Sequence, residues 1–211
     1  MLSLLSQGFV TSLLIFALTL LFSMPLGLAV MFGRRSRLTP LRGFIKAYIS
    51  IMRGTPLMLQ LMVVFYGPKL LLGVTVPGNW RFTAVIVAFV INYAAYFAEI
   101  YRGGIESIPR GQYEAAQVLG YTKAQTFFKI ILPQMVKRVI PAVTNEVITL
   151  VKDTSLAKTI AIMELIMTGE SYMKSAGIVW PLFYTAVFYL AFVGILTLLF
   201  NYIERKLSYF R

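Results

Sequence analysis

Hydrophobic residues form five long runs along the chain, separated by shorter polar stretches. A run of about twenty apolar residues predicts a membrane-spanning helix, because the hydrocarbon core is ~30 Å thick and a helix rises about 1.5 Å per residue. The pattern therefore predicts an all-α membrane protein with one transmembrane domain over residues 1–211. The expected helices are about residues 8–32, 55–72, 82–101, 139–161 and 178–203.

Composition supports this prediction and removes other classes of protein. Hydrophobic residues make up 58% of the chain and charged residues 13%, with a mean hydropathy of +0.76. An average soluble domain is about 25% charged, so a soluble enzyme, a DNA-binding domain and a disordered chain are excluded. The sequence has no cysteine and no histidine, so disulfides, thiolate nucleophiles and the usual zinc ligands are absent, and no metal site is expected.

Basic residues cluster between the predicted helices and indicate an orientation. The chain has 20 Lys and Arg against 8 Asp and Glu, a net charge of +12. Six basic residues and no acid lie between residues 34 and 53, and six more lie between 102 and 138. Cytoplasmic loops of membrane proteins carry such an excess of Lys and Arg. We therefore expect both stretches to be cytoplasmic loops, with the N-terminus outside and the C-terminus in the cytoplasm.

The polar stretch between the third and fourth helices has a pattern of its own. Residues 112–119 and 123–131 read as two short helices, with Gly120 ending the first and Leu132-Pro133 ending the second. By pattern alone, this segment is a compact amphipathic loop over about residues 105–133.

The loop contains Glu114-Ala115-Ala116, then Gly120 four residues later, Ile130 ten residues after that, and Leu132-Pro133. This spacing resembles the EAA loop of bacterial ABC importer permeases. Other segments resemble the polar amino acid uptake branch of that family, namely residues 53–56, 98–104, Pro141, Asn145 and 152–156. The resemblance implies that the loop fits a groove on a separate ATPase subunit and carries its motion to the membrane helices. The ATPase-coupling residues carried over in this way are Glu114, Ala115, Ala116, Gly120, Ile130, Leu132 and Pro133.

The resemblance also implies an assembly in the inner membrane of a bacterial cell. It implies two ATPase subunits, a second permease subunit that is a copy or a close relative, and an extracytoplasmic amino-acid-binding protein. The sequence has no Gly-x-x-x-x-Gly-Lys-Ser/Thr phosphate loop. We therefore expect no enzyme activity and no cofactor in this chain, with ATP and Mg bound by the partner ATPase. Membrane lipid is an expected partner, and nucleic acid is not.

Polar residues inside the predicted helices point to a pathway, because an ionisable group is costly within a membrane. Three on the third helix and three on the fourth follow helical spacing and share a face. They predict two walls of a water-filled cavity that binds substrate. An alternative is that Lys152 and Asp153 only neutralise other charges, and that Glu99 pairs with Arg102. The candidate substrate-binding residues are Asn92, Tyr96, Glu99, Asn145, Glu146, Thr149, Lys152 and Asp153.

The charges on these candidates favour a cationic substrate, since three acids face one lysine. A basic amino acid, arginine above all, fits better than glutamate. The function predicted is import of polar, basic amino acids by alternating access. One alternative is a self-contained ion-coupled transporter or channel that uses the intramembrane acids. Another is a membrane-anchored assembly protein whose basic loops contact acidic lipid or nucleic acid.

Overall fold

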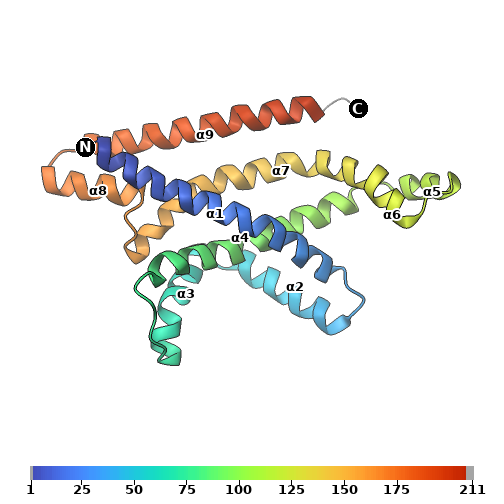
Figure 1. The fold of residues 1–211 in the computed structure, drawn as a ribbon, viewed down its shortest axis with the longest axis horizontal. Coiled ribbons are helices and arrows are strands. Elements are labelled where there is room, and N and C mark those ends of the chain that lie inside the picture. Colours follow the sequence, from blue (N-terminus) through green and yellow to red (C-terminus); the bar gives the residue numbers. More distant parts are fainter. Residues whose placement is uncertain (1, 208–211) are drawn as a thin grey trace.

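The computed structural model describes residues 2–207, which contain helices joined by short connections and no strand (Figure 1). The helices α5 and α6 lie at one end of the molecule, while α8 and the N-terminus lie at the other. The elements are α1 (Leu2–Arg34), α2 (Thr39–Gly54), α3 (Leu57–Leu72), α4 (Trp80–Glu106), α5 (Arg110–Val118), α6 (Lys123–Gln125), the π-helix η1 (Thr126–Ile131), α7 (Leu132–Asp153), the 3-10 helix η2 (Thr154–Ile160), α8 (Leu165–Ala176) and α9 (Trp180–Leu207).

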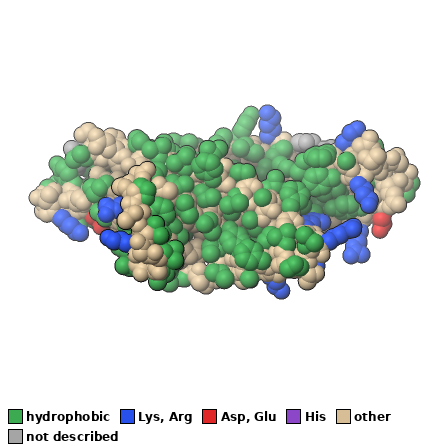
Figure 2. Space-filling view, turned by 60° about the horizontal axis from the view of Figure 1, so that its bottom comes forward, with side chains coloured by type: hydrophobic (Ala, Val, Ile, Leu, Met, Phe, Trp, Pro, Cys, Tyr) green, Lys and Arg blue, Asp and Glu red, His purple; other side chains and the backbone are tan. Residues whose placement is uncertain are grey.

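Three helices, α1, α4 and α9, are long and apolar enough to cross a membrane. The pair α2 and α3 passes the same test together, although a bend of 110° separates the two. The fourth expected span corresponds to α7, which has 22 residues but is too polar to count among these candidates. Figure 2 shows apolar side chains over the middle of one face, with most charged side chains toward the two ends.

The basic stretch before residue 54 is helical, so the prediction that residues 34–53 form a loop is wrong. Over α2 the basic residues Arg42 and Lys46 are exposed, while Ile49 is buried and Tyr48 and Met52 are partly buried. This periodicity of one polar and one apolar face makes an amphipathic helix. Because α2 carries several basic residues, it does not form a continuous run of apolar residues in the sequence.

The expected helix end at Leu132-Pro133 is also wrong, because α6, η1 and α7 follow one another without a break. Proline is tolerated in the first turn of a helix, where its missing N–H would have no partner. Here Pro133 falls in the first turn of α7, directly after a π-helical segment in which the Leu132 N–H donates to the Phe127 carbonyl. The wider π-turn lets the chain pass this proline and stay helical.

The core of the fold is the contact between α1 and α4, which cross in the middle of the molecule (Figure 1). Tyr93 and Phe97 of α4 are among the largest fully buried side chains. Gly27 of α1 lies directly against α4, where a Cβ atom would stand 2.8 Å from Phe97 Cβ and 3.0 Å from the Ala94 carbonyl oxygen. Such distances leave no room for a side chain.

Replacing Gly27 with valine is therefore expected to force α1 away from α4. Overpacking of this kind costs roughly 1–3 kcal/mol of unfolding free energy, so the melting temperature of the purified protein in detergent should fall. The matched control is Gly194→Val on α9, where nothing lies within 4 Å of the added Cβ. Equal melting temperatures for the two variants would contradict the close approach of α1 and α4.

Candidate functional site

A short break separates α2 from α3 and leaves backbone groups outside either helix. Thr55 and Pro56 form this break, and α3 starts at Leu57 without a side-chain cap. The amide of Asn92 donates to the Met52 carbonyl at 3.1 Å and to Gln60 Oε1 at 2.9 Å. Asn92 is 4% exposed, and its amide links α4 to α2 through Met52 and to α3 through Gln60. A broken helix of this kind is tolerated at membrane depth where it lines a cavity.

A cavity of about 430 Å³ lies beside this break, bounded by the start of α3, by α4, by α7 and by η2. No lysine or arginine lines it. Two carboxylates from α7 do, so the lining is acidic in character. The candidates that the structure brings together around this cavity are Asn92, Tyr96, Glu146, Thr149 and Asp153.

Tyr93 is a lining residue that sequence reasoning missed. Its hydroxyl donates to Asp153 Oδ2 at 2.7 Å, and its ring centroid lies 6.2 Å from that of Tyr96. Tyr93 is 2% exposed. From the sequence alone, it looks like any aromatic residue of the core. The hydrogen bond orients the Asp153 carboxylate and joins α4 to α7 across the cavity wall.

Asn145 and Lys152 do not line this cavity, and both are exposed. Thr149 lines it, although its hydroxyl is engaged with the Asn145 carbonyl at 2.9 Å. The helical spacing placed Asn145 and Lys152 beside the acidic stripe of α7, and the structure turns them away from it.

Glu99 is apart from the cavity, within a cluster of arginines. It accepts hydrogen bonds from Arg102, the shortest at 2.7 Å, and lies 3.8 Å from Arg34 and 3.9 Å from Arg53. The pairing with Arg102 was the alternative expected for this residue. Glu99 is thus hydrogen-bonded to Arg102, with the last basic residues of α1 and α2 nearby, and the remaining contact of Arg102 is with Glu106.

The first predicted short helix is present as α5, and Gly120 ends it as expected. Gly120 has a φ of +74°, and the N–H groups of Gly120 and Tyr121 donate to the carbonyls of Gln117 and Ala116, each at 3.0 Å. This pair of bonds is a Schellman C-cap, which favours glycine because other residues rarely adopt positive φ. Thr122 and Gln125 then form a capping box that starts α6.

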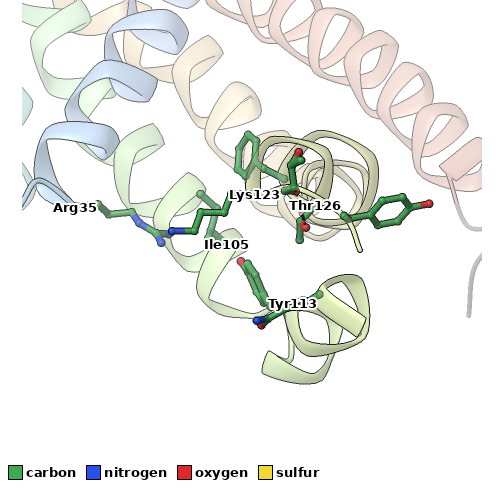
Figure 3. Close-up of a pocket in the computed structure, with 9 residues that line it drawn as sticks. Arg35, Ile105, Tyr113, Lys123 and Thr126 are labelled. Carbon is green, nitrogen blue, oxygen red and sulfur yellow. Dashed lines mark hydrogen bonds between the residues drawn. The ribbon is translucent and has the colours of Figure 1, made fainter. Parts of the chain in front are cut away.

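The helix α5 presents two different faces. Tyr113 and Gln117 line a cavity of about 670 Å³ under the helix, together with Arg35 from the chain after α1 and Ile105 from α4. Figure 3 shows Arg35, Ile105 and Tyr113 approaching this space from three segments. The opposite face is uncovered, and its exposed residues are Glu114, Ala115, Val118 and Leu119.

The remaining motif positions divide between surface and interior. Ala116 is fully buried at 0% exposure, so it packs within the chain and offers no surface to another subunit. Ile130 and Leu132 are partly buried and Pro133 is exposed. The motif thus contributes one exposed helix face on α5 and the packing that connects it to α7.

A further buried acid, Glu164, caps α8 outside the cavity. Its carboxylate accepts from the N–H groups of Ile166 and Met167, each at 2.8 Å, and the residue is 0% exposed. Burial raises the pKa of Glu164, while the two backbone hydrogen bonds oppose that rise. Among the residues that the structure describes, no cluster of three or more acids could hold a metal ion.

The architecture and the sites define a polytopic membrane protein with a polar cavity at a broken helix and a short exposed helix at one end. Residues 23–209 match the family described as binding-protein-dependent transport system inner membrane component. The match covers most of the chain, so this protein belongs to that family.

Individual relatives agree over nearly the whole length. The chain is 35% identical to the L-cystine transport system permease protein TcyB of Bacillus subtilis, over 97% of this chain and 86% of that protein. It is 34% identical to the arginine transport system permease protein ArtQ of the same organism, over 96% and 91%. A crystal structure of an amino acid ABC transporter with histidines superposes with a TM-score of 0.88 at 30% identity, covering 97% and 94%.

These matches confirm several of the predictions made from the sequence. The chain is a multi-pass, inner-membrane permease of the amino acid ABC transporter type, and ATP hydrolysis belongs to a partner subunit. They give no support to the alternatives of a self-contained ion-coupled transporter and of an assembly protein.

Proposed function

We propose that this permease imports basic amino acids, with arginine as the best substrate, through the cavity at the α2–α3 break. The observation that carries the proposal is the lining of that cavity, where Glu146 and Asp153 are present and lysine and arginine are absent. Two carboxylates attract the ammonium and the guanidinium of arginine, and they repel the side chain of glutamate. The relative named for arginine transport agrees with this choice.

The proposed topology has five spans, formed by α1, the broken pair α2–α3, α4, α7 and α9. With α5 on the cytoplasmic side, the N-terminus is outside and the C-terminus is inside. The basic residues around α2 and α5 then follow the positive-inside rule. The proposed assembly contains a second permease subunit, two ATPase subunits that bind ATP and Mg, and an extracytoplasmic binding protein.

In the proposed mechanism, the exposed face of α5 docks on an ATPase subunit. ATP-driven closure of the ATPases moves α5, and the continuous rod of α6, η1 and α7 transmits that motion to Glu146 and Asp153. The cavity then opens alternately to the two sides of the membrane. No covalent chemistry takes place in this chain.

Equilibrium binding of labelled arginine to the purified permease–ATPase complex, without the binding protein, tests this function. We expect saturable binding that lysine and histidine displace at lower concentrations than glutamine, and that glutamate displaces least, in the order of their charges. If the complex binds no arginine, selectivity belongs to the soluble binding protein alone. If glutamate competes as well as lysine, the acidic lining does not select the substrate.

A further inference from the structure

The acidic cavity leaves one part of an amino acid without a partner. Every α-amino acid carries a carboxylate beside its ammonium, and an unpaired charge is costly to bring into a membrane. Glu146 and Asp153 serve the cationic groups and would repel this carboxylate. Lys152 and Lys158, the two bases within the predicted fourth span, are exposed and do not line the cavity.

Arg53, the last basic residue of α2, lies against Tyr96 on α4. Its guanidinium carbon is 5.4 Å from the centroid of the Tyr96 ring, and Tyr96 is a lining residue. Two residues further on, the cavity lining begins with Thr55 at the helix break.

The donors of Arg53 are available for a ligand. The distance from the Arg53 guanidinium to Glu99 is 3.9 Å, which is too long for a hydrogen bond. The Glu99 carboxylate instead accepts from Arg102. Within residues 2–207, the Arg53 side chain donates no hydrogen bond, and it is 47% exposed. A guanidinium with free N–H groups matches the two oxygens of a carboxylate.

The positions of the charges suit a zwitterion. Arg53 lies over Tyr96, whereas Asp153 is bonded to the neighbouring Tyr93. The Arg53 cation and the Asp153 carboxylate therefore lie against two different tyrosine rings of α4. The start of α3 at Leu57, a lining residue, has no side-chain cap, so its first N–H groups add partial positive charge at the cavity.

We propose that Arg53 binds the α-carboxylate of the transported amino acid, while Glu146 and Asp153 bind its cationic groups. This inference rests on the proposed function, in which the cavity receives an amino acid. It assigns recognition of the α-carboxylate to the end of α2 and recognition of the cationic groups to α7.

The test compares arginine with agmatine, the same molecule without its carboxylate. Dissociation constants are measured on the purified permease–ATPase complex, as wild type and as Arg53→Met. Wild type should prefer arginine by about tenfold, the effect of one charge-assisted pair. In Arg53→Met this preference should disappear through loss of arginine affinity, and Arg53→Lys should keep part of it. Arg42→Met, at an exposed position on the same helix, should bind both ligands as wild type does.

Other outcomes overturn the proposal. If Arg53→Met retains the wild-type preference for arginine, the carboxylate is bound elsewhere. If the variant weakens arginine and agmatine equally, Arg53 acts only through the structure around Glu99. Failure of the wild-type complex to bind arginine would instead contradict the proposed substrate site itself, and the wild-type measurement alone reveals it.

Discussion

Replacing Gly120 with valine should separate ATP hydrolysis from uptake. Gly120 closes α5 with a φ of +74°, a conformation that costs a non-glycine residue about 1–2 kcal/mol and a β-branched residue more. Nothing lies within 4 Å of the added Cβ, so the cost comes from the backbone alone. The turn must change, and the exposed face of α5 then meets the ATPase at a different angle.

The expected size follows from the role proposed for α5. Loss of a central interface contact costs about 2 kcal/mol, or roughly 30-fold, so uptake into proteoliposomes should fall on that order. ATP hydrolysis and arginine binding should remain measurable. The matched control is Gly120→Asn at the same position, because asparagine tolerates positive φ, and it should retain most of the uptake. Unchanged uptake in Gly120→Val, or equal losses in both variants, would contradict the coupling role.

Asp153→Asn should lower arginine affinity by about 30-fold, since a hydrogen bond to a charged group contributes about 2 kcal/mol. In the structure, the Tyr93 hydroxyl donates to Asp153 Oδ2 at 2.7 Å. The substitution keeps the shape of the side chain and an oxygen that can accept this hydrogen bond. It removes the negative charge that faces the cavity. Glutamine affinity should fall less, because glutamine has no side-chain charge to pair with Asp153.

Tyr93→Phe is the control for this experiment. It removes the hydrogen bond to Asp153 and keeps the carboxylate, so we expect a smaller loss that is equal for arginine and glutamine. Titration calorimetry on the purified complex gives both affinities. If Asp153→Asn weakens arginine and glutamine equally, Asp153 is a structural partner of Tyr93 and does not select the substrate.

The first short helix of the loop over residues 105–133 was predictable from the sequence because its end signal is local. Gly120 adopts positive φ and closes α5 within a few residues. The capping box at Thr122 was not predicted, nor was the continuation through Pro133. That continuation depends on a π-turn, and no composition pattern marks a π-turn in advance.

The polar stripes were predictable in part. Helical spacing alone places Glu146, Thr149 and Asp153 on one face of α7, and the structure puts all three at the cavity. The same spacing grouped Glu99 with Asn92 and Tyr96, but Glu99 lies one turn further, among arginines from α1 and α2. Spacing relates residues within a helix and carries no information about which other helices approach each turn.

Hydropathy and charge along the chain were sufficient for the membrane class and for most of the long apolar helices, because these depend on local periodicity and on the properties of the bilayer. The tertiary structure was needed to reveal the 110° bend between α2 and α3, the bond from Tyr93 to Asp153 and the place of Arg53 beside Tyr96. Each of these joins residues from different helices. Their arrangement follows from packing across the fold, where close contacts such as Gly27 against Phe97 set the positions of the helices.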